Sequence, residues 1–402
     1  MHYVRLLRAP QFDASVNDKL QLVLAITTDL GDSLLSLPQP MELVVTAHQI
    51  VDSQEVQWNL SKKGQVVWMP GSRVVKPVLS FPKKVQIALL RRQEIKLCIR
   101  VVKENSANSV RKILGVASTT GADEGLVMPA WYTLRQGLDP DHSILRRLEM
   151  GTNKENESLV QEVEILEEIG QSIARHFWDG GLTALCAIAA TVTISTDELK
   201  HGPCVRHVHE VLSREGNSQI LELGCGVGTL GIGLATLSAN LSKDVLETEG
   251  TCNILMTDVE EAESTARSNM ALFQAKFDSL EKNRTKLSYD NLDWEEGRHG
   301  RFVEEIQSRA WDLIVLADCT YNSDTLQPLV DTLSALHVSN KNAGATLATK
   351  VFIATKPRHD SERAFVGYMK AAGWDLCEEE VLPLPLLGRE PESVELYLYS
   401  KA

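Results

Sequence analysis

The strongest constraint in the sequence is a glycine-rich turn between an apolar strand and an apolar helix. Residues 219–223 have strand character and lead directly into Gly224, Gly226 and Gly228, and the Ala-rich run 230–237 has helical character. Glycine has no Cβ, so a turn of this kind lets a ligand lie against bare backbone. The sequence therefore predicts a cofactor-binding strand–turn–helix unit of a doubly wound α/β protein.

Three classes of cofactor compete for this turn. A phosphate-binding loop requires Gly-Lys followed by Ser or Thr, and the turn contains no lysine. A dinucleotide register, with Gly226, Gly228 and Gly231 as G-x-G-x-x-G, starts two residues late and leaves Glu222 at the strand end without a role. The register E-x-G-x-G-x-G suits a ligand with an ammonium and a ribose but no phosphate. It favours S-adenosylmethionine.

The next strand supports this choice. Residues 253–257 read as a strand that ends at Asp258, and a polar helix follows over residues 260–277. An acidic residue at the end of the second strand of a doubly wound fold binds ribose hydroxyls. Asp258 lies 30 residues after Gly228 instead of the usual ~20, which predicts a polar insertion over residues 238–251.

One further motif precedes the glycine turn, and two follow Asp258. Residues 177–181 read F-W-D-G-G, residues 292–294 read L-D-W, and residues 317–321 read A-D-C-T-Y. In this order, with the glycine turn and Asp258, they resemble the seven-β-strand S-adenosylmethionine-dependent methyltransferases, specifically the family 16 protein lysine methyltransferases. The resemblance covers residues 159–402. It implies a seven-stranded Rossmann-like sheet, S-adenosylmethionine as the cofactor, and a protein substrate as the partner.

The resemblance also implies which residues form the cofactor site. They are Trp178, Glu222, Gly224, Gly226, Gly228, Asp258, Asp293, Trp294 and Ala317. Glu222 and the three glycines would hold the methionine end, Asp258 the ribose, and the Asp293-Trp294 pair the adenine. For Trp178 and Trp294, a place in the apolar core is the alternative.

Asp318 and Tyr321 are the predicted residues for the methyl acceptor. Methyl transfer from a sulfonium is an in-line displacement, so its barrier falls mostly through positioning. A lysine acceptor, with a pKa of about 10.4 in water, must lose a proton before it attacks. Asp318, after the strand 311–317, would orient the ammonium, and the Tyr321 phenol would accept a hydrogen bond from the amine while its ring faces the cation. The segment lacks the N-P-P-Y sequence of enzymes that methylate bases or glutamine.

Two other functions stay open. A small-molecule (nicotinamide-like) N-methyltransferase would share the fold and the donor site, although a small amine would not require an additional domain. A catalytically silent protein that only binds the cofactor would act through its N-terminal half. The intact glycines, Asp318 and Tyr321 argue against the silent protein.

The cysteines and histidines indicate neither disulfides nor a metal site. Seven scattered cysteines without a C-x-x-C pair indicate a reducing compartment. Cys225 and Cys319 lie in the predicted site loops, and we interpret them as small filler residues. His201, His207 and His209 form a cluster without a placed carboxylate beside it, and no metal is expected.

The predicted environment is the cytoplasm or the nucleus. The beginning of the chain shows no signal-peptide pattern, and the longest apolar stretch, residues 182–194, is too short to cross a bilayer. A length of 402 residues with 43% hydrophobic and 24% charged residues is ordinary for a globular protein of two or three domains. No contact with a membrane is expected, and the sequence does not indicate an oligomeric state.

The N-terminal part of the chain differs in charge and in pattern. Residues 1–115 have a net charge of +7, from 16 basic and 9 acidic residues, which leaves −20 for the remainder of a chain whose total is −13. Short apolar runs with β-branched residues predict a sandwich-like all-β domain over residues 1–118. The expected strands are 21–28, 41–47, 65–69, 85–90, 95–102 and 113–117.

Three basic pairs lie in or beside the expected turns of this domain: Lys62-Lys63, Lys83-Lys84 and Arg91-Arg92. They are interpreted as solvated turns or edge protection. The alternative is a docking surface for an acidic protein or an anionic membrane. The few aromatic residues argue against binding of single-stranded nucleic acid.

The domain organisation follows from these patterns. A connecting segment is expected over residues 119–157, irregular over 119–141 and polar over 151–157, with a helix beginning at residue 158 and ending at 176. The methyltransferase domain is expected over residues 158–402. Alternating strands and helices predict a mostly parallel sheet there, with later strands at 313–317, 350–355, 377–382 and 394–400.

Overall fold

The chain divides into two compact units in the computed structural model, and each is described by itself. Unit 1 contains residues 1–148, 164–176 and 384–392, and unit 2 contains residues 149–163, 177–383 and 393–402. The structure describes residues 1–117, 125–151, 162–170, 173–193, 202–244, 250–277, 284–384 and 386–402.

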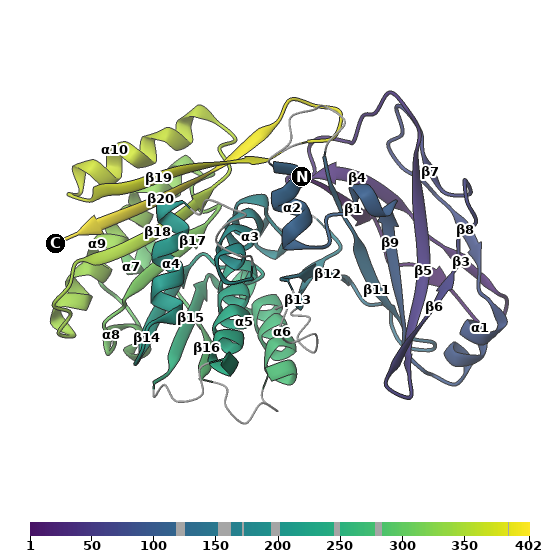
Figure 1. Ribbon diagram of the computed structural model, residues 1–402, viewed down its shortest axis with the longest axis horizontal. Helices are drawn as coiled ribbons and strands as arrows, with labels where there is room; N and C mark the ends of the chain where they lie inside the picture. The colour runs from purple at the N-terminus through teal and green to yellow at the C-terminus, as the bar shows by residue number, and fades with distance from the viewer. Residues whose placement is uncertain are drawn as a thin grey trace. The chain divides into compact units, whose positions relative to one another are not determined.

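Unit 2 is built on a seven-stranded sheet (Figure 1). Its strand order is β16-β15-β14-β17-β18-β20-β19. The pairs from β16 to β18 are parallel, and β20 is antiparallel to β18. The strands are β14 (Ser218–Leu223), β15 (Cys252–Asp258), β16 (Thr285–Asn291), β17 (Leu313–Ala317), β18 (Thr349–Thr355), β19 (Asp375–Leu384) and β20 (Glu392–Lys401). The predicted doubly wound sheet, including its final reversed strand, is confirmed.

Helices pack on both faces of this sheet because its strands are buried on both sides. Leu221 and Leu223 point to the face covered by α9 and α10, whereas Ile220 and Glu222 point to the opposite face. On that face α3, α4, α5 and α6 contact one another in turn. The helices are α3 (Asp179–Thr193), α4 (Pro203–Ser213), α5 (Thr229–Asp244), α6 (Glu260–Phe277), α7 (Trp294–Gly297), α8 (Glu304–Gln307), α9 (Leu326–Asn342) and α10 (Ala364–Ala371), with 3-10 turns η3 (Ser323–Thr325) and η4 (Asp360–Arg363).

The strand order reverses at β14. This strand pairs with β15 on one side and with β17 on the other, both in parallel. In open α/β sheets the crevice beyond the carboxyl ends of two such strands is where ligands bind. The glycine turn and Asp318 therefore follow adjacent strands at the same edge of the sheet.

Unit 1 is rich in β-structure and contains three sheets. The largest has the order β13-β12-β11-β9-β5-β6, with β7 paired to β5, and two three-stranded sheets have the orders β10-β1-β4 and β2-β3-β8. The strands are β1 (His2–Leu6), β2 (Gln11–Phe12), β3 (Lys19–Gln21), β4 (Leu24–Thr28), β5 (Met41–Val51), β6 (Gln54–Asn59), β7 (Val67–Trp68), β8 (Val78–Ser80), β9 (Ile95–Val101), β10 (Val127–Met128), β11 (Ala130–Leu134), β12 (Ser143–Glu149) and β13 (Glu162–Glu168). Two helices, α1 (Lys83–Leu90) and α2 (Val110–Ala117), and the turns η1 (Lys103–Asn105) and η2 (Ile173–Arg175) complete it.

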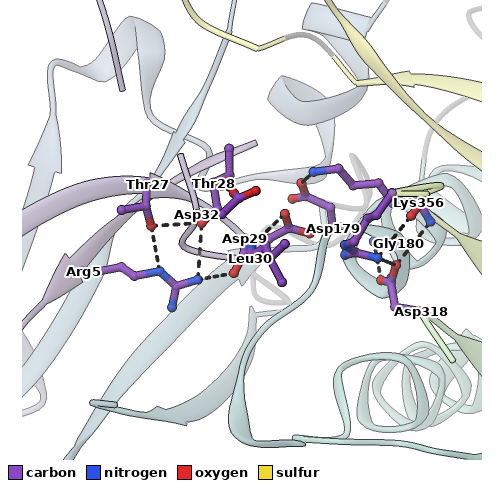
Figure 2. Close-up of polar contacts among 12 residues, drawn as sticks. Arg5, Thr27, Thr28, Asp29, Leu30, Asp32, Asp179, Gly180, Asp318 and Lys356 are labelled. Carbon is purple, nitrogen blue, oxygen red and sulfur yellow. Dashed lines mark hydrogen bonds and ion pairs between the residues drawn. The ribbon is translucent and has the colours of Figure 1, made fainter. Parts of the chain in front are cut away.

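Parts of unit 1 come from distant positions in the sequence. Leu387, from the loop between β19 and β20, is 3% exposed and belongs to the apolar core formed by β5 and β9. Glu167 on β13 forms a buried ion pair with Arg146 on β12. The Arg146 Nη1 also donates to the Pro129 carbonyl at 2.7 Å. Near the amino terminus, Arg5 Nε donates to Thr27 Oγ1 at 3.0 Å (Figure 2).

Two strands expected in an all-β domain are helices. Residues 85–90 belong to α1, where Val85, Ala88 and Leu89 are buried. Their spacing of three and four residues is that of a helix face, which the short apolar run concealed. Residues 113–117 likewise belong to α2. The N-terminal part is therefore β-rich but not all-β.

The expected helix over residues 158–176 is also wrong in its described part. Residues 162–168 form β13, and the buried residues Val163, Ile165 and Glu167 alternate as in a strand. Residues 158–161 lie outside the described residues. The segment expected to be irregular contains β10 and β11, and the connecting segment 119–157 is split between the two units. Within the described residues, no helix is long and apolar enough to cross a membrane.

Candidate active site

The glycine turn between β14 and α5 has left-handed backbone at all three predicted positions. Gly224, Gly226 and Gly228 have φ values of 63°, 55° and 83°, which side chains other than glycine rarely adopt. A Cβ at Gly224 would also lie 2.6 Å from the Cys319 Sγ and 3.1 Å from the Trp294 ring. The sequence suggested that ligand approach alone requires glycine here. The structure adds two other reasons, backbone conformation and close packing.

Glu222 is buried at the end of β14, with 1% of its surface exposed. Its Oε2 accepts a hydrogen bond from the Gly231 N–H at 3.1 Å, in the first turn of α5. A Cβ at Gly231 would lie 2.2 Å from this oxygen, so glycine at this position makes room for the carboxyl group. Burial raises the pKa of Glu222 well above its ordinary value.

Asp258 connects the second strand to the glycine turn. Its Oδ2 accepts a hydrogen bond from the Gly226 N–H at 2.7 Å, and its Oδ1 accepts one from the Val259 N–H at 2.7 Å. Burial raises the pKa of this carboxyl group. The two predicted motifs therefore meet. The long spacing between them arises because α5 continues to Asp244, and residues 245–249 lie outside the described residues.

The L-D-W motif lies beside this junction. The Leu292 N–H donates to the Asp258 carbonyl at 2.8 Å, and Asp293 caps α7 by accepting from the Glu295 N–H at 2.9 Å. The Trp294 ring is partly buried against Gly224. An open hollow of about 600 Å³ begins here, lined by Val259, Glu260, Glu261, Asn291, Leu292, Asp293, Glu296, Arg301 and Val303.

The W-D-G-G motif forms the start of α3 and is bound to the end of β17. Asp318 Oδ2 accepts hydrogen bonds from the Gly180 N–H at 2.7 Å and the Gly181 N–H at 3.2 Å (Figure 2). A Cβ at Gly180 would lie 2.4 Å from this oxygen, and one at Gly181 would lie 3.4 Å from the Ala317 Cβ. These glycines thus let the carboxylate satisfy free N–H groups of the first helical turn.

Two basic residues after β18 complete this arrangement. The Lys356 Nζ lies 2.9 Å from the Asp179 Oδ2, and the side chains are 6% and 0% exposed (Figure 2). The Arg358 Nη1 lies 3.0 Å from the Asp318 Oδ1, and its guanidinium lies 5.0 Å from the centre of the Trp178 ring. We call Asp179, Asp318, Lys356 and Arg358 the α3 clamp.

Comparison with known proteins identifies the catalytic half. A family model described as lysine methyltransferase matches residues 157–372, more than half of the chain. The chain belongs to this lysine methyltransferase family. It is an S-adenosylmethionine-dependent methyltransferase, as the register of the glycine turn predicts.

One relative is similar to almost the whole chain. A UPF0665 family protein of Schizosaccharomyces pombe is 25% identical over 388 residues, which are 96% of this chain and 97% of the relative. Solved structures match at lower similarity. A putative RNA methyltransferase of Pyrococcus horikoshii is 15% identical and covers 54% of this chain and 96% of its own, with a TM-score of 0.29. A methyltransferase of Methanosarcina mazei is 12% identical and covers 50% and 99%, with a TM-score of 0.31.

The residues of this methyltransferase fit the expected donor site. Three left-handed glycines lie between the carboxyl groups of Glu222 and Asp258, as the donor register requires. The Trp294 ring lies against Gly224 of the turn, and Leu292 and Asp293 of the same motif line the hollow. Within the described residues, no group of three or more His, Cys, Asp or Glu side chains is arranged to hold a metal ion.

The structure gives Asp318 a different role from the predicted contact with the acceptor. Its side chain is 4% exposed and accepts from four donors: the N–H groups of Gly180, Gly181 and Lys356 and the Arg358 guanidinium. Asp318 has a φ of 53°, which shows that its backbone is held in an uncommon conformation. This carboxylate holds the start of α3 at the end of β17, and little of its surface is exposed to an arriving ammonium.

Tyr321, unlike Asp318, has an exposed side chain. It is 48% exposed. Partial burial raises the pKa of its phenol, and the nearby carboxyl groups of Asp258 and Glu261 raise it further. The phenol therefore stays protonated around neutral pH. Tyr321 follows β17, and Cys319 on the same segment contacts the Gly224 carbonyl at 3.6 Å.

The sequence did not point to Lys356 and Arg358. Their signal is a basic K-P-R segment directly after a buried strand, at the edge where acidic residues of neighbouring motifs converge. The interpretation of the site cysteines as filler fits their burial. Cys225 and Cys319 are 8% and 4% exposed, and burial raises both thiol pKa values well above the ordinary range.

Proposed function

We propose that this enzyme methylates the side-chain nitrogen of a lysine in a protein substrate. The observation that carries the proposal is the exposed Tyr321 side chain, two residues after Cys319, whose Sγ lies 3.6 Å from the Gly224 carbonyl in the glycine turn. The family model that matches the chain is described as lysine methyltransferase, which supports the same acceptor.

The donor would be held by groups on both sides of the glycine turn. Glu222 would pair with the ammonium of the methionine end, and this ammonium would stabilise the charged form of a carboxyl group whose pKa is raised by burial. Asp258 would accept hydrogen bonds from the ribose hydroxyls while it keeps the hydrogen bond from the Gly226 N–H. Trp294 and the residues beside Val259 would enclose the adenine.

S-adenosylmethionine supplies a methyl group bonded to a positively charged sulfur. The acceptor ammonium would first lose a proton to solvent, and its nitrogen lone pair would then take the methyl group from the sulfonium, which would leave as a neutral thioether. Tyr321 would orient the amine, because its oxygen can accept an N–H hydrogen bond and its ring can face a cation. Asp318 would act on the reaction only through the position of α3. The barrier falls chiefly through this positioning.

Labelled methyl transfer tests the proposal. The purified chain is incubated with S-adenosylmethionine labelled in its methyl group and with an extract of cytoplasmic and nuclear proteins, where we expect the substrate to be found. Acid hydrolysis of labelled proteins should yield methylated lysine. Gly226→Arg, which inserts a side chain at a φ of 55° beside Asp258, should abolish the transfer.

Each alternative gives a distinct result. Label in nicotinamide or another small amine, and not in protein, would establish a small-molecule enzyme. Donor binding without any transfer would establish a silent binding protein. Either result contradicts the proposal.

A further inference from the structure

Unit 1 contains a long segment without acidic residues. Residues 56–93 include eight Lys or Arg residues and no Asp or Glu, in a chain whose total charge is −13. All eight side chains are exposed. They are Lys62, Lys63, Arg73, Lys76, Lys83, Lys84, Arg91 and Arg92.

None of these charges is neutralised within the segment. The structure describes every residue from 56 to 93, and none of the eight side chains forms an ion pair with a described residue. Two other exposed basic residues of unit 1 do have an acidic neighbour: Arg135 lies 2.9 Å from Glu94, and Lys19 lies 3.6 Å from Asp18. The segment therefore presents a free positive charge.

Helix α1 arranges four of these residues around an apolar centre. Its inner face consists of Val85, Ala88 and Leu89, which are buried. Residues 83, 84, 87, 90 and 91 fall on the opposite face, because they follow the spacing of a helical stripe. Helix α1, labelled in Figure 1, follows β8 and precedes β9 in the chain. We call Lys83, Lys84, Ile87, Leu90, Arg91 and Arg92 the α1 face.

The apolar part of the α1 face is accessible. Ile87 and Leu90 are 48% and 49% exposed, and Val78 on the preceding strand β8 is 54% exposed. Single exposed aliphatic residues are ordinary, but two on adjacent turns of a short helix, enclosed by basic residues, form a small contact surface.

The end of α1 adds a further basic side chain to the α1 face. Arg92 has a φ of 58°, and its N–H bonds the Leu89 carbonyl while the Gln93 N–H bonds the Ala88 carbonyl. A helix that ends in this way usually has glycine at the left-handed position, because glycine adopts it without strain. Here the position carries a second exposed guanidinium beside Arg91.

We propose that the α1 face is a docking site for an acidic segment of a partner protein, one whose carboxylates alternate with aliphatic side chains. The basic residues would pair with the carboxylates, and Ile87 and Leu90 would cover the aliphatic groups. An amphipathic helix that places its apolar side on such a surface is a common mode of peptide recognition. The complementary charges would raise the rate of association and select against basic partners.

Other anionic partners fit the α1 face less well. A helix that lies in a membrane surface needs a wide apolar face, whereas α1 has eight residues and exposes only two aliphatic side chains and no aromatic one. Single-stranded nucleic acid binds chiefly by stacking on aromatic residues, and α1 carries none. The combination of apolar and basic groups favours a protein segment.

This docking site does not depend on methyl transfer. It would serve a substrate or a regulatory protein equally. Where the partner is also the substrate, a second contact would raise the effective concentration of its target lysine without any change at the catalytic residues.

Direct binding to the full chain tests the proposal. The probe is a fluorescent synthetic peptide of Glu and Leu residues at helical spacing, measured by anisotropy at increasing salt. We expect saturable binding that weakens with salt. The change Lys83→Glu with Lys84→Glu should weaken it about tenfold, and folding should be kept because acidic residues suit the first turn of a helix. Ile87→Ser with Leu90→Ser should weaken it as well.

A matched control separates local from total charge. Lys286→Glu with Lys370→Glu changes the net charge equally, on exposed positions of β16 and α10, and should leave the affinity within about twofold. An oligouridylate and phosphatidylserine vesicles are measured in parallel. Tighter binding to either of them, equal loss in the control, or no binding of the Glu-Leu peptide would overturn the proposal.

Discussion

The carboxylate of Asp318 holds the first turn of α3, with the Gly180 N–H 2.7 Å from its Oδ2. The other oxygen binds Arg358 at 3.0 Å. One residue at the end of β17 thus connects the W-D-G-G segment with the segment that follows β18. The two ends of the D-x-x-Y motif therefore differ: Asp318 holds the start of α3, and Tyr321 is exposed.

Asp318→Asn should reduce stability more than a surface change would. The variant removes the negative partner of Arg358, whose side chain is 15% exposed, and loss of one partner of a buried pair costs roughly 3 kcal/mol. Urea unfolding measures the effect. Asp324→Ala, on an exposed residue close in sequence, is the control and should change little. An unchanged unfolding midpoint with a large loss of turnover would instead restore the predicted contact with the acceptor.

The Asp179–Lys356 pair should show strong coupling. Lys356→Met leaves the fully buried Asp179 without its ammonium, so this single change should cost roughly 3 kcal/mol. In a double-mutant cycle, adding Asp179→Asn should recover part of this loss, with an interaction free energy of about 1–3 kcal/mol. Additive effects of the two changes would mean that the ion pair contributes nothing to the α3 clamp.

The sequence predicted the catalytic sheet well because its periodicity is long and consistent. Buried parallel strands and the helices between them differ in length and pattern, and the strand ends at Leu223 and Asp258 agree with the structure. The meeting of Asp258 with the glycine turn was also predictable, since both follow neighbouring parallel strands. These are properties of local segments and of a known fold topology.

The role of Asp318 could not be predicted in this way. Its partners Lys356 and Arg358 are 38 and 40 residues away, and they meet it only because β17 and β18 are adjacent. Helix α1 was mistaken for a strand because its short apolar run fits both periods. The placement of Leu387 in unit 1 depends on tertiary packing alone.

Leu387→Ala should destabilise unit 1, although the residue belongs to the loop between two strands of unit 2. Loss of a leucine that is 3% exposed creates a cavity and costs about 2–5 kcal/mol. The rate of amide hydrogen exchange in β5 and β9 should rise. Leu376→Ala on β19, where the side chain is 43% exposed, is the control and should have little effect. Equal rates of amide exchange in β5 and β9 for both variants would show that the loop is not part of this core.

Tyr321→Phe and Tyr321→Ala should reduce methyl transfer without loss of stability. The side chain is 48% exposed, so the melting temperature should stay almost constant. Phenylalanine keeps the ring but loses the hydroxyl, and kcat/KM should fall about tenfold, with a further loss for alanine. Tyr368→Phe, on a residue 37% exposed in α10, is the matched control. Full activity of Tyr321→Ala would exclude the residue from the acceptor site.

Glu222 should make the enzyme without bound donor less stable as the pH rises. Burial raises the folded-state pKa above the ordinary value of 4.5, so the native state binds more protons than the unfolded state above that pH. Each unit of this rise costs about 1.4 kcal/mol once both states are ionised. Glu222→Gln removes the titration and can still accept from the Gly231 N–H. It should therefore be as stable as the parent or more stable at neutral pH, with a flatter pH profile.

The same variant should bind S-adenosylmethionine less tightly, because a neutral amide cannot pair with the donor's ammonium. Urea unfolding from acidic to neutral pH and calorimetric titration with the donor measure the two effects. Glu304→Gln, on an exposed residue of α8, is the control and should change neither. A Glu222→Gln variant with the parent's pH profile would mean that this carboxyl group is already ionised in the folded protein. Undiminished donor affinity would instead remove Glu222 from the donor site.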